Sequence, residues 1–228
     1  RLRTVTGVQT CALPISLKNQ TALITGGAGF LGFAHATSIL ECSGKVLLVD
    51  LNEENLRKTK KELSKEFSQN DIEIFICDVR TENEVSRLHQ TLKNSYPQIL
   101  INNAAINSQA DDKNLNSNFD SELDFNNWKL EIEVGLTGAF LMTKYFGGEM
   151  AKSGGGVILN IASDLSVISP NQNIYKNSTE RNALSYKKPV GYSVVKHGII
   201  GLTKYFATYW SEQGVRVNAL RSEEHTSE

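Results

Sequence analysis

Six short apolar runs, separated by stretches of helix length, constrain the fold of this chain more than any other feature. The runs are continuous rather than alternating, which is typical of strands that are covered on both faces. Strands that alternate with helices predict a parallel sheet with helices on both sides. We therefore expect a three-layer α/β fold with a doubly wound parallel sheet. The predicted strands are Thr21–Thr25, Lys45–Asp50, Ile72–Cys77, Ile99–Asn102, Gly156–Ala162 and Val215–Leu220.

Local signals mark where two of the intervening helices begin. Asn52 is a candidate N-cap for a helix over Glu53–Phe67. Thr81 and Glu84 have the spacing of a capping box, in which each side chain bonds the backbone of the other residue.

The longest predicted helices cover Trp128–Lys152 and Tyr192–Gln213. Two long polar segments, Asn107–Asn127 and Asp164–Pro189, are predicted as loops. Loops of this length inside a compact domain are usually functional.

Composition excludes several classes of protein. The chain has 228 residues, enough for one domain with a core, and 24 basic against 25 acidic residues predict no nucleic-acid partner. No apolar run approaches the roughly 20 residues of a membrane span, so we expect no membrane partner. The four histidines lack metal-ligand spacing, which predicts no metal site. Cys11, Cys42 and Cys77 form no CxxC motif, which suggests a reducing, cytoplasmic location.

Both ends of the chain resemble translated sequencing adaptor. The strings are VTGVQTCALPIS over Val5–Ser16 and RSEEHTSE over Arg221–Glu228. We therefore predict artefactual segments at 1–16 and 221–228, and one cofactor-binding and catalytic domain over 17–220 that is truncated at its C-terminus. Natural flexible tails are the alternative.

A glycine-rich turn follows the first predicted strand, where TGGAGFLG covers Thr25–Gly32. Glycines there let the backbone approach a pyrophosphate at a helix N-terminus, as in a Rossmann-type fold. Asp50 ends the second strand, where a carboxylate can accept the ribose hydroxyls of NAD and repel the 2′-phosphate of NADP. A plain strand-to-helix turn and a helix-capping role for Asp50 are the alternatives.

Three side chains form the candidate catalytic group. Tyr192 and Lys196 are four residues apart near the start of a predicted helix and therefore share a face. A nearby lysine cation lowers the pKa of a tyrosine, which can then exchange a proton with an alcohol or carbonyl. Ser163 ends the fifth strand and can hold the substrate oxygen. An exposed helix pair and a serine in a turn are the alternatives.

Taken together, these motifs resemble the short-chain dehydrogenase/reductase family, single-domain branch, over about Thr21 to Leu220. The resemblance implies NAD(P)-dependent interconversion of an alcohol and a carbonyl in a small molecule. It implies that Tyr192 is the acid/base, that Lys196 contacts the nicotinamide ribose, and that Ser163 orients the substrate. The residues expected to contact the cofactor are Thr25, Gly26, Gly29, Phe30, Leu31, Gly32, Asp50, Asp78, Val79, Asn102, Asn103, Ala104, Tyr192 and Lys196.

The sequence departs from the single-domain pattern in several places. Its glycine spacing is typical of the extended branch, and Gly135 stands where the family often has an asparagine. Ser163 and Tyr192 are 29 positions apart, about twice the usual separation, and the extra segment Ser166–Pro189 is predicted as a substrate lid. This segment is similar to bacterial oxidoreductases of flagellin and surface-sugar modification, which implies a sugar-derived substrate.

Two other functions stay open at this point. One is a sugar-nucleotide epimerase or dehydratase of the extended branch, and the other is a non-catalytic NAD-binding protein. The resemblance also implies a homodimer or homotetramer that associates through the two longest helices.

Overall fold

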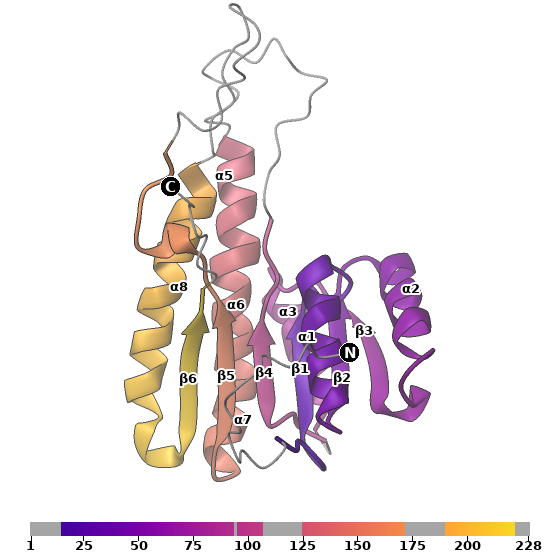
Figure 1. Ribbon diagram of the computed structural model, residues 1–228. Helices are drawn as coiled ribbons and strands as arrows, with labels where there is room; N and C mark the ends of the chain where they lie inside the picture. Colours follow the sequence, from indigo (N-terminus) through magenta and orange to yellow (C-terminus); the bar gives the residue numbers. More distant parts are fainter. Residues whose placement is uncertain (1–14, 94, 107–124, 172–189, 222–228) are drawn as a thin grey trace, which may run out of the picture.

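The computed structural model describes residues 15–93, 95–106, 125–171 and 190–221 (Figure 1). Its strands form one parallel sheet in the order β3-β2-β1-β4-β5-β6. This is the order of the Rossmann fold, so the predicted doubly wound α/β architecture is confirmed. The strands are β1 (Thr21–Thr25), β2 (Lys45–Asp50), β3 (Ile72–Ile76), β4 (Ile99–Asn102), β5 (Gly156–Ile161) and β6 (Val215–Leu220).

Two strands end one residue earlier than the apolar runs predict. In β3, Ile76 pairs with Asp50, the last residue of β2. In β5, Ile161 pairs with Leu220, the last residue of β6. Each strand therefore stops where its neighbour stops, because pairing rather than hydrophobicity defines the end of the ladder.

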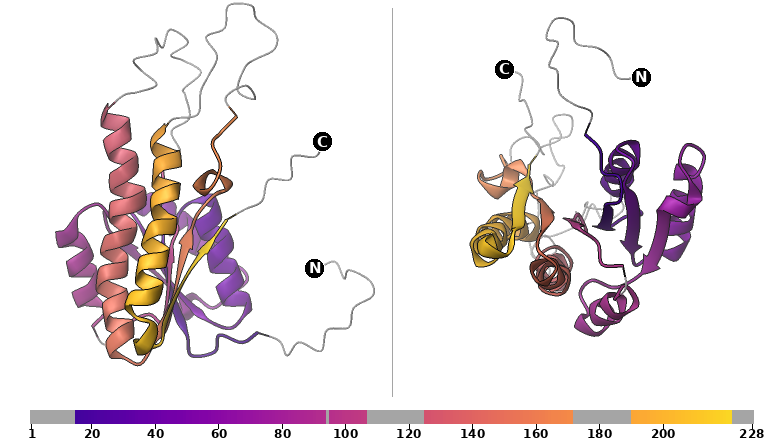
Figure 2. Two further views of the ribbon diagram at one scale, coloured as in Figure 1. Left: turned by 90° about the vertical axis from the view of Figure 1, so that its left-hand side faces the viewer. Right: turned by 90° about the horizontal axis from the view of Figure 1, so that it is seen from below.

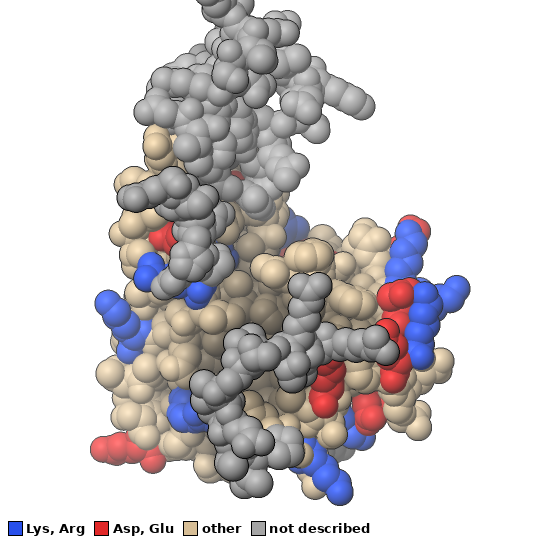
Figure 3. All heavy atoms as spheres, viewed as in Figure 1, with Lys and Arg blue, Asp and Glu red and all other residues tan. Residues whose placement is uncertain are grey.

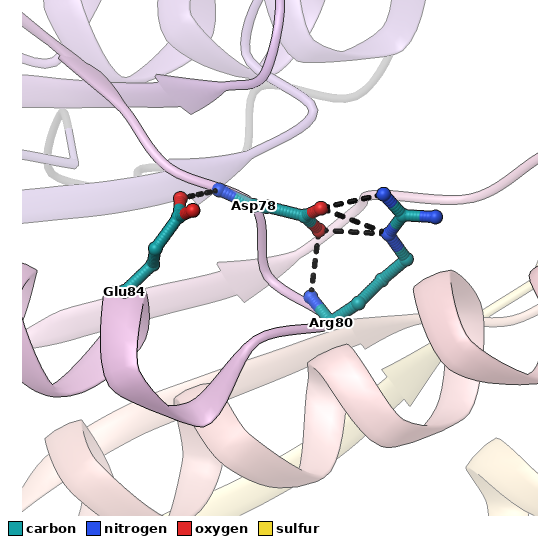
Figure 4. A network of polar contacts seen from close by, with 3 residues as sticks. All are labelled: Asp78, Arg80 and Glu84. Atoms are coloured by element: carbon teal, nitrogen blue, oxygen red, sulfur yellow. Dashed lines mark hydrogen bonds and ion pairs between the residues drawn. The ribbon is translucent and has the colours of Figure 1, made fainter.

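Helices connect the strands and lie on both faces of the sheet (Figure 2). The Asn52 cap is confirmed, since its side-chain oxygen accepts from the Asn55 N–H at 2.9 Å. The capping box at Thr81 is wrong. Thr81 makes no capping hydrogen bond, and the Glu84 carboxylate instead accepts from the Asp78 N–H at 2.7 Å (Figure 4). The helices are α1 (Phe30–Glu41), α2 (Glu53–Leu63), α3 (Glu82–Thr91), α5 (Phe125–Ile132), α6 (Gly138–Met142), α7 (Gly148–Lys152) and α8 (Val190–Tyr209).

Helices α5, α6 and α7 form one continuous rod, joined by π-helical segments at Glu133–Thr137 and Thr143–Gly147. The rod runs beside α8 (Figure 2). Glycines let the two approach closely: a Cβ on Gly135 would lie 2.5 Å from Val195, and one on Gly198 would lie 2.9 Å from Leu136. This packing holds α8 against the part of the sheet formed by β5 and β6.

The core has one layer on each side of the sheet, because successive strand residues face opposite ways. Leu23 and Leu100 face the side covered by α3, the α5–α7 rod and α8, where they join Phe146 and Phe206. On the other side, the strand residues pack with α1 and α2. The buried residues there are Ile24, Ala36, Leu40, Val46, Leu48, Leu56, Leu63, Ile72, Ile101 and Ile161.

The surface shows no field of a single sign in the view of Figure 3. Lysine, arginine and acidic side chains alternate over α2, where Lys58 and Glu54 form an ion pair at 2.6 Å. Within the described ranges, no helix combines the length and hydropathy needed to cross a membrane. Cys42 and Cys77 are free thiols, and burial raises the pKa of Cys77 to about 12.

Parts of the predicted loops and most of each predicted adaptor segment lie outside the described residues. The first loop is shortened by α5, which begins at Phe125, and the second opens with a 3-10 turn over Asp164–Ser166. The rest of these loops, including most of the predicted lid, falls in 107–124 and 172–189. The domain boundaries therefore stay a prediction.

The contact at Gly135 gives a stability test. We expect Gly135→Ala to lower the free energy of unfolding by about 1–3 kcal/mol, because the new methyl group overpacks the contact with Val195. The double variant Gly135→Ala with Val195→Ala should recover part of the loss. Urea denaturation of the two variants and the parent measures this, and an unchanged midpoint in Gly135→Ala would contradict the close contact.

Candidate active site

The glycine turn between β1 and α1 leaves no room for side chains at two positions. Gly26 has φ +63°, and a Cβ there would lie 3.0 Å from the Cα of Ala104. A Cβ on Gly32 would collide with the carbonyl oxygen of Gly26. The turn therefore presents bare backbone at the carboxyl end of β1.

Polar bonds tie this turn to the end of β4. The Thr25 hydroxyl accepts from the N–H groups of Asn103 and Ala104, each at 3.0 Å. The Asn103 amide nitrogen donates to the carbonyl oxygens of Thr25 at 3.0 Å and Gly26 at 3.2 Å. Since β1 and β4 flank the point where the strand order reverses, the tie shapes the crevice where doubly wound folds bind ligands.

The N-terminus of α1 opens onto the same turn. Its N-cap residue is Gly29, which offers no side-chain cap, so the first-turn N–H groups have no side-chain acceptor from it. The next residues are exposed, Phe30 at 90% and Leu31 at 49%. A positive helix end beside bare backbone suits a pyrophosphate, so these residues fit a dinucleotide cofactor.

Asp50 lies beside the glycine turn at the end of β2. Its Oδ2 accepts from the Ala28 N–H and its Oδ1 from the Asn52 N–H, both at 3.1 Å. The N-cap of α2 is Asn52, so the capping alternative for Asp50 is wrong. The carboxylate stands where it can meet a ribose next to the phosphate site.

Asp78 is paired within the protein (Figure 4). The Arg80 side chain donates to it through Nε at 2.9 Å and Nη2 at 2.6 Å. These hydrogen bonds hold the pKa of the Asp78 carboxyl below its usual range. The neighbouring Val79 side chain is buried, and it packs against Gly138. Of these two expected cofactor contacts, Asp78 is thus paired with Arg80 and Val79 belongs to the core.

The Asn102 side chain faces the interior. Its amide nitrogen donates to Asn160 at 2.8 Å and to Thr143 at 3.0 Å. Asn160 in turn donates to Thr203 of α8 at 2.8 Å. Of the predicted cofactor contacts at this strand, Asn103 and Ala104 adjoin the glycine turn, whereas Asn102 joins the sheet to the helices.

Ser163 follows β5 and begins the turn Asp164–Ser166. Its hydroxyl donates to the Asp164 carboxylate at 2.6 Å and accepts from the Leu165 N–H at 3.3 Å. The Ser166 hydroxyl completes a capping box by accepting from the Ser163 N–H at 3.0 Å. Asp164 is a candidate site residue that the sequence analysis missed, although its position directly after Ser163 was a usable signal.

Lys196, the cation of the candidate catalytic group, is buried. Its ammonium donates to the carbonyl oxygen of Ile161, the last residue of β5, at 2.6 Å. The same nitrogen lies 5.5 Å from the centroid of the Tyr192 ring. Burial lowers the pKa of Lys196 to about 8. The fold thus brings Tyr192 and Lys196 to the strand end that carries Ser163.

Comparison with known proteins identifies the family. The model of the short chain dehydrogenase family matches residues 20–179. The short chain dehydrogenase/reductase dpfgG of Gibberella zeae is 33% identical over 209 residues, which cover 90% of this chain and 69% of the relative. This chain therefore belongs to the short-chain dehydrogenase/reductase family. It is an oxidoreductase of a family that uses NAD(P).

Other relatives and structures agree with this assignment. The D-threitol dehydrogenase of Mycolicibacterium smegmatis is 27% identical, with 90% of this chain and 69% of the relative aligned. A gluconate 5-dehydrogenase from Burkholderia cenocepacia, solved with NADP and tartrate, superposes with a TM-score of 0.72 at 22% identity, covering 91% of this chain and 72% of that one. NAD⁺-bound xylitol dehydrogenase superposes with a TM-score of 0.71 at 23% identity, and the match covers 89% of this chain and 69% of that one. These structural matches show the shared fold.

The buried lysine yields a test of the site that needs no substrate. We expect Lys196→Met to raise the free energy of unfolding at neutral pH by about 2 kcal/mol, because folding no longer buries an ammonium. The lowered pKa of Lys196 means that the unfolded chain binds more protons above pH 8, so the parent gains stability as pH rises toward the usual lysine value.

The difference between variant and parent should therefore shrink across that interval. Denaturant titrations at several pH values measure it. A difference that is independent of pH would contradict the burial of a charged Lys196.

Proposed function

We propose that this protein is an NAD-dependent oxidoreductase that interconverts a secondary alcohol and a carbonyl on a sugar or sugar-derived substrate. The observation that carries the proposal is the buried ammonium of Lys196, held at the end of β5 within 5.5 Å of the Tyr192 ring centroid. Relatives named as D-threitol dehydrogenase and glycerol dehydrogenase support a polyhydroxylated substrate.

Tyr192 is the proposed acid/base. The Lys196 cation beside its ring favours the phenolate, which lowers the pKa of the tyrosine toward the working range. The phenolate then takes the proton of a substrate alcohol, and in reverse the phenol returns it to a carbonyl oxygen. Bound nicotinamide would accept or supply the hydride that accompanies this proton.

Ser163 is the proposed anchor for the substrate oxygen, with Asp164 as its partner. Its hydroxyl donates to the Asp164 carboxylate and accepts from the Leu165 N–H, so one lone pair remains for a further donor. A Ser163 held in this way can accept a hydrogen bond from a substrate hydroxyl. Rotation of the same hydroxyl toward a carbonyl would let it donate instead, which suits the reverse direction.

The preference for NAD over NADP is proposed from Asp50. Its carboxylate is fixed beside the phosphate-binding turn by the Ala28 and Asn52 N–H groups. A carboxylate in this position accepts both ribose hydroxyls and repels a 2′-phosphate.

Association into a homodimer or homotetramer through α5–α7 and α8 is likewise proposed. Large apolar or aromatic side chains on these helices are exposed, among them Phe140, Val194 and Tyr205. The cytoplasmic location stays a prediction from the cysteine pattern.

Replacement of the proposed acid/base tests the enzyme assignment. We expect Tyr192→Phe to reduce turnover with a polyol panel by at least about a hundredfold, since the proton-transfer group is lost. NADH binding, followed by fluorescence, should survive. Tyr209→Phe is the matched control, because Tyr209 lies on the same helix and is 60% exposed. Equal turnover in Tyr192→Phe and Tyr209→Phe would refute the catalytic role.

Replacement of Asp50 tests the cofactor preference. We expect Asp50→Asn to lower the ratio of kcat/KM for NAD to that for NADP by about tenfold or more, because the like-charge repulsion disappears. Asparagine keeps an acceptor for the backbone N–H groups, so the turn should hold its shape. Steady-state kinetics with both cofactors gives the ratio, and a parent enzyme that favours NADP would overturn the proposal.

A further inference from the structure

A buried carboxylate lies against the helix turn that carries Tyr192. Glu131 of α5 is only 2% exposed. Its Oε2 occupies the space of a side chain at Gly191, since a Cβ on that glycine would collide with it. Gly191 directly precedes Tyr192 in the first turn of α8. The packing of two helices far apart in sequence thus brings Glu131 against the residue that precedes Tyr192.

The second oxygen of this carboxylate is unusual. Oε1 of Glu131 is buried, and no group in the described part of the chain donates a hydrogen bond to it. A buried carboxylate without such a donor destabilises the folded state. An apolar residue would fill the same position at no such cost. The carboxylate is therefore poorly explained as a packing residue, and its contact with Gly191, directly before Tyr192, points to a role in the site.

Among the described residues, the first half of α8 carries two side chains that can be positively charged. Lys196 lies close to the ring of Tyr192, and the imidazole of His197 lies 2.9 Å from the Ser193 carbonyl oxygen through Nδ1. Three elements that pack against α8 carry acidic residues. The residues are Glu131 on α5, Glu133 in the π-helical segment, which pairs with Lys129 at 3.7 Å, and Asp164 in the turn after β5, which accepts from Ser163. Arg216 lies near the amino-terminal end of β6, at the opposite end of the strands from Ser163.

We propose that Glu131 is a positioning residue for Tyr192: its buried carboxylate seats the first turn of α8 through Gly191 and sets a negative charge against ionisation of the tyrosine. The proposal rests on the proposed function only in assigning Tyr192 to proton transfer. Lys196 draws Tyr192 toward the phenolate, and Glu131 opposes it. The balance keeps a larger share of phenol, which is the form that protonates a carbonyl.

The sign of the effect follows from the charges. A negative group near a tyrosine disfavours the phenolate and raises its pKa, so removal of the charge lowers it. Gln replaces Glu with nearly the same shape and no charge. Glu131→Gln should therefore move the midpoint of the Tyr192 titration to lower pH. Its melting temperature should equal or exceed that of the parent, since a buried charge is gone.

The test reads Tyr192 directly rather than through turnover. The full chain is labelled with tyrosine carrying ¹³C at Cζ, and the resonances are titrated with pH by NMR. Among the seven tyrosines, the Tyr192 signal is the one that Tyr192→Phe removes. The matched control is Glu149→Gln, which alters a partly buried carboxylate on the same helical rod, paired with Lys152 rather than packed on α8. An unchanged Tyr192 pKa in Glu131→Gln, or an equal shift in Glu149→Gln, would overturn the electrostatic role.

A second pair of variants tests the contact itself. Gly191→Ala should displace the carboxylate and move the Tyr192 resonance, and adding Glu131→Ala should bring it back toward the parent position because the collision is relieved. A resonance that ignores Gly191→Ala would overturn the positioning role. If Tyr192→Phe keeps full turnover, the proposed function fails, yet both NMR results still decide whether Glu131 acts on Tyr192.

Discussion

The position of the candidate active site depends on one buried pair of amides, Asn102 on β4 and Asn160 on β5. Asn102 donates to Asn160 at 2.8 Å and to Thr143 in the helical rod at 3.0 Å. Asn160 donates to Thr203 of α8 at 2.8 Å, and the Thr203 hydroxyl donates on to the Ile199 carbonyl at 2.8 Å. Because buried polar groups need partners, this chain of hydrogen bonds favours one position of the rod and of α8 on the sheet.

The position of the first half of α8, which carries Tyr192 and Lys196, follows from these hydrogen bonds. Thr203 lies two turns beyond Lys196, on the same buried stripe of the helix. When Thr203 is fixed to the strand, Lys196 meets the end of β5, where the Ile161 carbonyl accepts from its ammonium. The burial that lowers the pKa of Lys196 destabilises the folded state. The hydrogen bonds among Asn102, Asn160 and Thr203 offset this destabilisation. Active sites commonly combine such a locally unfavourable group with stabilising contacts elsewhere.

The sequence located the strands well because continuous apolar runs have few alternative structures in a chain of this length. It also placed Asp50, Tyr192 and Lys196 on the correct elements, since strand ends and helical spacing are local properties. It was wrong about Thr81 and Glu84, whose spacing allowed a capping box, because the Asp78 N–H competed for the Glu84 carboxylate. Such competition between neighbouring groups has no signature in spacing alone.

By itself, the sequence determined the alternation of strands and helices, the glycine turn and the four-residue spacing of the tyrosine and lysine, because each depends on neighbours along the chain. Tertiary structure decided the rest. In the tertiary structure the Asn102 side chain faces the interior, where it bonds Asn160. Val195 occupies the space beside Gly135, and Glu131 contacts Gly191. These outcomes depend on how closely two helices approach each other and the sheet. That distance is set by side chains far apart in sequence, so no local pattern encodes it.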